Sequence, residues 1–372
     1  MKKQVNQKIE IMVIGLGYVG LPLALELSKY FQVMGFDISR KRISELNNGI
    51  DVTNEIKKKI KFTSGNIKFT SNYLDCKKCN IFIITVPTPV TQKNEPDLKN
   101  LYEASSLVAK IIKKRDIVVI ESTVFPGVTE EIIAPIIEKK SGLKSGEDFN
   151  MGYSPERINP GDSKYKVVNI KKVVSADNKK TLRKISHIYN KIIKAGIHSV
   201  SSIKVAETSK AIENAQRDIN IAFINEVAMI SKAMNVNSHE VLRAANTKWN
   251  FLNFKPGLVG GHCIGVDPFY LAKAAKLAGH NPEVILAGRK INDSMPKFIF
   301  NNAIKHIKKK SRILILGLTF KENVSDIRNS KSATLEKLFK NGGYNVEVYD
   351  PLADKKLAFS EYNIKLKIPK KK

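Results

Sequence analysis

A glycine motif set between a predicted strand and a predicted helix limits this chain to few folds. Residues 11–14 form a continuous apolar run, which is typical of a parallel strand covered on both faces. Gly15, Gly17 and Gly20 follow at once with the spacing G-x-G-x-x-G, and residues 21–29 have a helical pattern. A strand, this motif and a helix in that order predict the dinucleotide-binding turn of a doubly wound α/β fold.

Each part of the motif has a physical role. The first glycine makes the turn, the second lets a pyrophosphate approach the backbone, and the third lets the helix pack on the strand. A second predicted strand over 31–36 ends at Asp37, whose carboxylate can accept hydrogen bonds from ribose hydroxyls. An acid there repels a 2′-phosphate and favours NAD over NADP, although Arg42 nearby opposes that preference. NAD is the predicted cofactor.

Hydroxyl side chains follow the later strands of the predicted sheet. Strands are expected over 80–86, 117–121 and 150–154, and their carboxyl ends lie where ligands bind in such sheets. Shorter strands near 173–174 and 198–200 complete this half. The residues assigned to the cofactor site here are Gly15, Gly17, Tyr18, Val19, Gly20, Asp37, Arg42, Thr85, Pro87, Thr88, Ser122 and Thr123.

Composition narrows the partners and the compartment. The formal net charge is +28, but the basic residues are spread along the chain without a nucleic-acid-binding motif, so an anionic small ligand explains the charge better. No apolar run approaches the roughly 20 residues of a membrane helix. Three cysteines argue against a disulfide scaffold and for a reducing cytoplasm. Cys76 and Cys79 form one C-x-x-C without a second pair, so no metal site is predicted.

A second glycine-rich stretch, residues 255–268, surrounds a single thiol, Cys263, beside His262. A cysteine held on such a loop in a basic protein can act as a thiolate nucleophile. The alternative is a tight turn that contains a buried cysteine, and the loop alone does not decide between them. The backbone-bending residues of the loop are Pro256, Gly257, Gly260, Gly261 and Gly265.

Residues 202–234 have the pattern of one long helix. Val205 and Ile212 belong to its expected apolar face. Lys210 and Asn214 are four residues apart and therefore project from the same side. They are either a polar site or a solvated edge. A helix of this length is typical of a domain connector or of a dimer seam.

A shorter α/β pattern closes the chain. Strands over 313–317 and 345–350 flank a polar loop over 318–330 and a helix over 331–340. The phosphate-binding glycines are absent from this loop, and Lys321 and Arg328 could hold a different anion. Too few strands follow for a closed domain, so this domain is expected to be truncated.

Together these motifs resemble the UDP-glucose/GDP-mannose dehydrogenase family. The resemblance covers roughly residues 9–355 and rests on separate motifs along the chain. Within the family, residues 261–268 most resemble the UDP-N-acetylhexosamine 6-dehydrogenases, which act on N-acetylglucosamine or N-acetylgalactosamine derivatives. The motifs are Gly15 to Gly20, Ser122 to Val124, Ser154 to Glu156, Lys210 with Asn214, Cys263 with Asp267, and Gly317 to Lys321 with Arg328.

The resemblance implies an NAD-dependent four-electron oxidation of a sugar primary alcohol to a uronic acid for surface polysaccharide. Cys263 would carry the thiohemiacetal and the thioester. The implied catalytic residues are Cys263, Lys210, Asn214, Glu156, Asp267 and Thr123. Arg328 joins the cofactor residues, and the implied substrate residues are Glu156, Arg157, Lys210, Asn214, Gly260 and Lys321.

The resemblance also implies three domains and a cytoplasmic homodimer. An NAD-binding Rossmann-type domain is expected over 1–200, a central helical domain for dimerisation and catalysis over 201–308, and a partial UDP-sugar-binding Rossmann-like domain over 309–372. The expected partner is a UDP-sugar, with no nucleic acid and no membrane insertion. Three alternatives stay open at this point: a UDP-glucose 6-dehydrogenase, a two-electron hydroxy-acid dehydrogenase, and a non-catalytic remnant that binds a nucleotide sugar.

Overall fold

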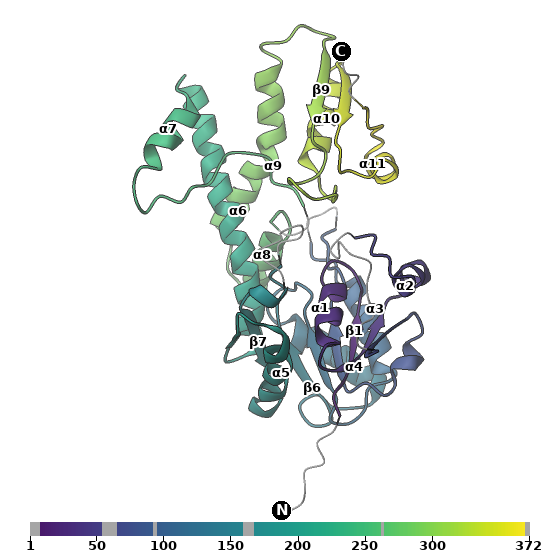
Figure 1. The fold of residues 1–372 in the computed structure, drawn as a ribbon. Coiled ribbons are helices and arrows are strands. Elements are labelled where there is room, and N and C mark those ends of the chain that lie inside the picture. Colours follow the sequence, from purple (N-terminus) through teal and green to yellow (C-terminus); the bar gives the residue numbers. More distant parts are fainter. Residues whose placement is uncertain (1–7, 54–64, 92–94, 159–166, 262–263, 369–372) are drawn as a thin grey trace, which may run out of the picture. The chain divides into compact units, whose positions relative to one another are not determined.

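A computed structural model describes residues 8–53, 65–91, 95–158, 167–261 and 264–368 (Figure 1). The chain forms two compact units, Met1–Ala211 and Ile212–Lys372. The α/β fold class predicted from the sequence is confirmed, with parallel strands in both units. The finer division at residues 200 and 308 stays a prediction.

The first unit contains an eight-stranded sheet in the order β3-β2-β1-β4-β5-β6-β7-β8. All neighbouring strands are parallel except β6 and β7, which are antiparallel. The bounds are β1 Glu10–Ile14, β2 Gln32–Phe36, β3 Ile67–Thr70, β4 Ile81–Ile84, β5 Ile117–Ile120, β6 Asn150–Tyr153, β7 Lys172–Ala176 and β8 Ile197–Ser199.

Both faces of this sheet are covered, as the continuous apolar runs predict. Ile11 and Val13 point to one face, where they pack with residues of α1 (Gly20–Leu27), α2 (Arg40–Asn47) and α5 (Lys179–Ile192). Met12 points to the opposite face and is fully buried. Helices α3 (Lys99–Ala109) and α4 (Ala134–Ser141) pack against each other and contribute further buried side chains (Figure 1). Because β1 to β6 are parallel, their carboxyl ends lie together at one edge of this sheet.

The longest helix, α6 (Ile203–Ala233), begins in the first unit and continues in the second. Its buried apolar positions are mostly small: Ala206, Ala211, Ala215 and Ala222, together with Ile203 and Ile224. The expected apolar face is therefore wrong at Val205 and Ile212, which are 45% and 50% exposed. The helix packs closely through alanines and leaves larger apolar side chains on its outer surface. Helices α7 (Ser238–Ala245), α8 (Asp267–Leu277) and α9 (Glu283–Ala303) follow.

The end of the second unit is a β-α-β arrangement with its own apolar cluster. Strands β9 (Arg312–Leu316) and β10 (Asn345–Tyr349) are parallel, and α10 (Lys331–Asn341) connects them. Phe339 of α10 packs edge-on against Phe300 of α9, with ring centroids 5.1 Å apart, so this cluster joins α9 to the α/β part. A short helix, α11 (Lys355–Tyr362), follows β10. Among the described residues, no helix is both long and apolar enough to cross a bilayer.

Candidate active site

The glycine turn of the first unit has the geometry that a dinucleotide needs. Gly15 has φ +92°, a left-handed conformation that glycine adopts without strain. A Cβ on Gly20 would lie 1.8 Å from the Gly15 carbonyl oxygen and 2.4 Å from Thr85 Oγ1, so only glycine fits there. A Cβ on Gly17 would meet nothing within 4 Å, which leaves open space beside the backbone. Tyr18 and Val19 complete the turn, and Val19 occupies the N-cap of α1. This turn therefore fits a pyrophosphate at the start of the helix.

Asp37 lies at the carboxyl end of β2, as expected. One carboxylate oxygen accepts from the Leu16 N–H at 2.9 Å and the other from the Ser39 N–H at 2.9 Å. Each oxygen keeps a further lone pair, so the carboxylate can still accept from two ribose hydroxyls.

Arg42 is a buried support of the turn. Its Nε donates to the Leu16 carbonyl oxygen at 3.0 Å, and its Nη2 forms an ion pair of 2.9 Å with Asp51, whose side chain is 1% exposed. Through Nε and Nη2 the guanidinium holds the turn and Asp51 together. The preference for NAD over a cofactor with a 2′-phosphate rests on the Asp37 carboxylate, which repels that phosphate.

The hydroxyl residues after β4 and β5 hold the strand ends together. The Thr85 hydroxyl lies 2.9 Å and 2.8 Å from the carbonyl oxygens of Ile14 and Gly15. The Thr88 hydroxyl donates to the Thr123 carbonyl oxygen at 2.6 Å. The Ser122 hydroxyl donates to the Val86 carbonyl oxygen at 2.6 Å, and the Pro87 carbonyl accepts from Asn100 at 3.0 Å. These contacts bring the predicted cofactor residues to one edge of the sheet.

Glu156 follows β6 and lines a small open pocket. Its carboxylate accepts from the Ile158 N–H, and Arg157 Nη1 donates to the Lys171 carbonyl oxygen at 2.9 Å. The lining residues of the pocket are Pro155, Glu156, Arg157, Ile158, Val167, Ile170, Lys171 and Lys172. Glu156 and Arg157 therefore share one pocket, which is consistent with the predicted substrate role of both.

A buried ion pair adjoins this pocket, with Lys172 in the pocket lining, and the sequence does not predict it. Lys172 Nζ forms an ion pair of 2.8 Å with Glu121, and the Tyr189 hydroxyl donates to the same carboxylate. Burial raises the pKa of Glu121, although the Lys172 ammonium opposes the increase. Burial and the neighbouring Glu121 charge also raise the pKa of Tyr189 well above its ordinary value.

Helix α6 carries the predicted lysine and asparagine. Lys210 is 7% exposed and Asn214 is 9% exposed, so the lysine is not part of a solvated edge. The Asn214 amide donates to the Asp267 carboxylate at 2.5 Å. Asp267 is 2% exposed and lies in the first turn of α8, where the helix dipole favours a negative charge. The structure thereby joins Asn214 to Asp267, which are 53 residues apart.

The glycine-rich loop packs closely on the loop that follows β9. A Cβ on Gly260 would lie 2.6 Å from the Asn329 carbonyl oxygen. Gly261 has φ +83°, and a Cβ there would lie 2.6 Å from the Phe320 ring. The Asn329 amide donates to the Gly261 carbonyl oxygen at 3.3 Å. Close packing thus accounts for these glycines, including Gly260. Cys263 and His262 lie outside the described residues.

The loop after β9 contains the two basic residues that the resemblance assigns to ligand binding. Arg328 is exposed and forms an ion pair of 2.5 Å with Asp326. Lys321 Nζ lies 5.9 Å from the centroid of the Phe320 ring. The assignment of Arg328 to the cofactor and of Lys321 to the substrate stays a prediction.

The second unit contains a buried polar group of its own, which the sequence does not predict. Asn225 contacts both the N–H and the carbonyl of Gly257, at 2.8 Å and 3.0 Å, and therefore holds the start of the glycine-rich loop. Its amide also donates to Asn292 at 2.8 Å, and Asn292 contacts Asp218, which pairs with Arg289 at 2.7 Å. Burial raises the pKa of Asp218, opposed by the Arg289 charge. The polar positions 214, 218 and 225 on α6 continue the stripe begun by Lys210, and that spacing is the signal that could have revealed them.

The Rossmann-type turn, the acid after β2 and the buried lysine and asparagine on one helix define an NAD-dependent dehydrogenase. Three family models match the chain in order. They describe the NAD binding domain over residues 9–193, the central domain over 204–294 and the UDP binding domain over 314–371. The chain belongs to the UDP-glucose/GDP-mannose dehydrogenase family, as the motifs predicted, and is an NAD-dependent oxidoreductase of nucleotide sugars.

Relatives match over nearly the whole chain. A UDP-N-acetyl-D-glucosamine 6-dehydrogenase from Pseudomonas aeruginosa is 49% identical, with 96% of this chain and 86% of the relative covered. Protein CapL from Staphylococcus aureus is 51% identical, with 96% and 85% covered. Among solved structures, a UDP-D-ManNAc dehydrogenase from Pyrococcus horikoshii has a TM-score of 0.85 at 33% identity, with 93% and 84% covered.

Proposed function

We propose that this protein oxidises the C6 primary alcohol of a UDP-N-acetylhexosamine, with UDP-N-acetyl-D-glucosamine as the first candidate, to the uronic acid. The observation that carries the proposal is the contact of Asn214 with the buried Asp267. It connects the Lys210–Asn214 helix to the end of the glycine-rich loop that contains Cys263. The choice of sugar is supported by relatives of 48% and 49% identity that are UDP-N-acetyl-D-glucosamine 6-dehydrogenases.

The proposed reaction removes four electrons in two hydride transfers. The alcohol first loses a proton and a hydride to give an aldehyde. The Cys263 thiolate then forms a C–S bond to the aldehyde carbon, and the oxygen gains a proton. Loss of a second proton and hydride from this thiohemiacetal gives a thioester, and attack by water breaks the C–S bond and releases the acid. In total, one alcohol, one water and two NAD⁺ give one carboxylate, two NADH and three protons.

The buried residues of α6 suit the charges that this sequence develops. Lys210 is a fixed cation in a site with little water, where an ammonium stabilises an oxyanion far better than in bulk solvent. Asn214 can hold the same oxygen or the attacking water while Asp267 fixes its amide. We assign general acid–base catalysis of thioester hydrolysis to Glu156, and the ordering of a water to Thr123.

NADH release from a panel of UDP-sugars tests this function. We expect two NADH per molecule of UDP-N-acetyl-D-glucosamine and slower release from the galactosamine, mannosamine and glucose analogues. One NADH per sugar would indicate a two-electron dehydrogenase, and preference for UDP-glucose would support the alternative substrate. Binding of NAD⁺ without turnover of any sugar would support a non-catalytic role.

Substitutions of the two central residues separate the steps. Cys263→Ser is expected to become very slow at the second oxidation or to stall after it, because an ester is harder to form and to hydrolyse than a thioester. Lys210→Ala is expected to lower kcat by about 100-fold or more while leaving NAD⁺ affinity within a few-fold. Equal losses of kcat and of NAD⁺ affinity in Lys210→Ala would place this lysine in the cofactor site instead.

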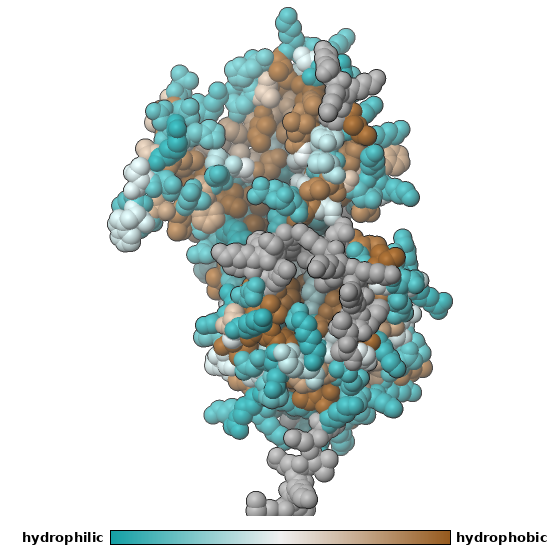
Figure 2. All heavy atoms as spheres, in the orientation of Figure 1, coloured by the Kyte–Doolittle hydropathy of each residue, from teal (hydrophilic) through white to brown (hydrophobic). Residues whose placement is uncertain are grey.

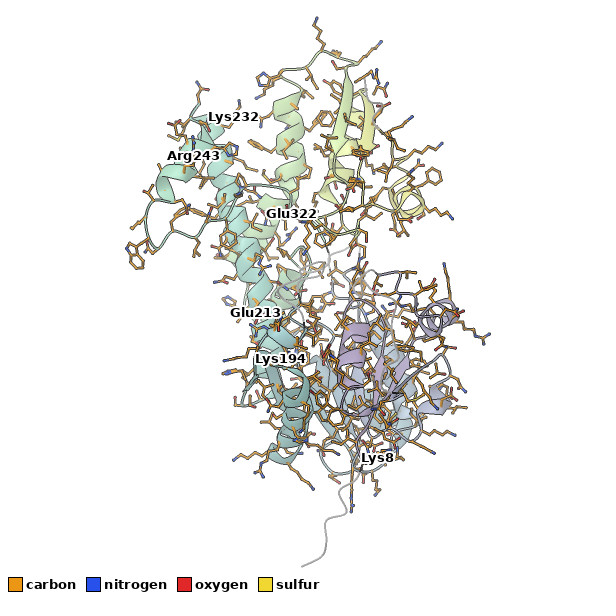
Figure 3. The ribbon with its side chains drawn as sticks, viewed as in Figure 1. Lys8, Lys194, Glu213, Lys232, Arg243 and Glu322 are labelled. Carbon is orange, nitrogen blue, oxygen red and sulfur yellow. The ribbon has the colours of Figure 1, made fainter. Side chains whose placement is uncertain are left out.

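We also propose that the protein forms a homodimer through α6 and α7. Phe223 and Met234 on or beside α6 are 57% and 69% exposed, and Trp249 after α7 is 92% exposed. Apolar residues lie at the surface of α6 and α7 (Figure 2). The charged residues Lys232 and Arg243 belong to the same two helices (Figure 3). Such exposed apolar surface is typical of an interface. Light scattering should give a dimer for the wild type and a monomer for Phe223→Glu. Leu357→Glu, at a 51% exposed position of α11, is the control and should leave the dimer intact.

We place the enzyme in the cytoplasm, as a source of uronic acids for surface polysaccharide. NAD dependence and a required free thiol support a reducing compartment. Fractionation of cells that express the full chain, with NADH formation as the readout, tests the location.

A further inference from the structure

We propose that Glu121 and Lys172 are positioning residues for Glu156, and that their ion pair sets the charge under which Glu156 acts. This inference rests on the proposed function, in which Glu156 assists thioester hydrolysis. Neither residue belongs to a motif on which the resemblance rests, and the structure alone brings them together.

The ion pair lies between the two loops that carry Thr123 and Glu156. Glu121 directly follows β5 and precedes Ser122 and Thr123. Lys172 begins β7, and its Nζ lies 2.8 Å from the Glu121 carboxylate and 3.5 Å from the Pro155 carbonyl oxygen, in the peptide that enters Glu156. One ammonium therefore contacts both loops.

Both members of the pair are buried. Glu121 is 1% exposed and Lys172 is 5% exposed. Tyr189 of α5 contacts both members of the pair, because its hydroxyl donates to Glu121 and its ring centroid lies 5.0 Å from Lys172 Nζ. A buried ion pair of this kind is weak as a source of stability, since desolvation offsets much of the attraction. A contribution of the pair to the action of Glu156 would explain why these two charges are buried.

The pair adjoins the pocket of Glu156. Lys172 lines that pocket with Glu156, whereas Glu121 does not. The charge of Glu156 in turn acts on both Glu121 and Tyr189. Among the described residues, the other charged ones in the lining are Lys171 and Arg157, and the Lys171 carbonyl oxygen accepts from Arg157 Nη1. Glu156 thus shares its pocket with the ammonium of the pair.

This arrangement predicts opposite effects for the two members of the pair. Glu121→Gln keeps the shape but leaves the Lys172 ammonium without its counter-charge, which favours the carboxylate form of Glu156. The acid limb of the kcat–pH profile should move by about 0.5 to 1 pH unit to lower pH. Lys172→Met removes the cation, so the acid limb should move to higher pH. The double variant should return towards the wild-type profile.

Pre-steady-state kinetics of the same variants identify which step of the reaction becomes slow. Impaired hydrolysis should leave the first two NADH per site fast, lower kcat about 10-fold or more and accumulate a sugar adduct on Cys263. KM for NAD⁺ should stay unchanged. Lys172→Arg, which keeps the charge, should keep the pH at which the acid limb is half-maximal.

Asp116→Asn is the matched control. Asp116 lies just before β5, as Glu121 lies just after it, and it is buried and paired with Lys113 at 3.2 Å. This variant should lower Tm without moving the pH profile. Lys172→Met leaves a buried acid unpaired and is expected to lower Tm, so Glu121→Gln alone carries the test if the lysine variant does not fold.

Two outcomes separate this inference from the proposed function. A wild type that releases two NADH per sugar, with Glu121→Gln unshifted or shifted to higher pH, overturns the role of the pair only. A wild type that releases one NADH, or none, overturns the proposed function and with it the role of Glu156.

Discussion

The chain contains the same β-α-β turn twice, once in each unit, and uses it in two ways. In both, the first strand ends at a glycine with positive φ, +92° at Gly15 and +96° at Gly317. In both, the next residue donates its N–H to an aspartate after the second strand, at 2.9 Å for Asp37 and 2.6 Å for Asp350. The common geometry holds the two strand ends together.

The two aspartates differ in how many donors they already have. Asp37 accepts from two backbone N–H groups and keeps capacity for a ligand. Asp350 accepts from the backbone N–H groups of four residues, Leu318, Thr319, Leu352 and Ala353. It also accepts from the Thr319 hydroxyl at 3.2 Å. Burial acts to raise the pKa of Asp350, but the N–H donors outweigh it and hold the pKa below its ordinary value. Asp37 can therefore still bind ribose hydroxyls, whereas Asp350 holds the backbone of two loops in place.

The connection to the helix differs as well. Residues 15–19 separate β1 from α1, whereas residues 317–330 separate β9 from α10. The short connection places a helix N-terminus directly beside the turn, where it can meet a phosphate. The long one replaces that site with a loop that packs on Gly260 and Gly261. The same local turn therefore supports cofactor binding in one unit and loop packing in the other.

The largest expected effect is at the third glycine of the first turn. Gly20→Val should destabilise the first unit by about 3 kcal/mol or more and abolish NAD⁺ binding, because its Cβ cannot fit beside the Gly15 carbonyl. Gly17→Ala is the control: it should keep Tm within a few degrees and still weaken NAD⁺ binding. Unfolding curves with and without NAD⁺ measure both. A stable Gly20→Val protein would contradict the packing seen here.

The next largest effects are expected at the two equivalent aspartates, Asp37 and Asp350. Asp37→Asn should lower NAD⁺ affinity about 10- to 100-fold with little loss of stability, measured by calorimetry. Asp350→Asn should do the reverse, costing about 1.5–3 kcal/mol of unfolding free energy while NAD⁺ affinity stays unchanged. If both variants lost the same property, the two turns would not have separate uses.

The contribution of Asp350 should depend on pH. Because its pKa is lowered in the folded state, the unfolded state binds the proton more readily. The stability advantage of wild type over Asp350→Asn should be full above pH about 5 and should disappear as the pH falls below about 4. Urea unfolding at several pH values measures it, and an advantage that grows on acidification would have the wrong sign.

The smallest effect is expected at Gly317. Gly317→Ala places a side chain at positive φ, but its Cβ meets nothing within 4 Å, so it should cost only about 1–2 kcal/mol. NAD⁺ affinity should not change. Gly15→Ala has the same φ penalty and also meets Val86 and Thr85 at 3.2–3.3 Å, so it should cost more and weaken NAD⁺ binding. Tm and NAD⁺ titration of the two variants provide the comparison.

Much of this protein follows from local sequence patterns. The glycine spacing predicts the NAD⁺ turn, and apolar runs predict the strands over 11–14 and 117–121. Helical periodicity predicts α6 to within one residue at each end. These features depend on neighbours only a few residues apart, so the sequence by itself determines them.

Only the tertiary structure decides which polar groups become buried together. Lys172 meets Glu121 from 51 residues away, and Arg289 meets Asp218 from 71. The antiparallel pairing of β6 and β7, and the exposure of Ile212 where a buried face was expected, depend likewise on distant contacts. A charged residue has the same local pattern whether it is solvated or paired in a core. Its role depends on the partner that folding brings to it, because burial without a partner would be too costly in free energy.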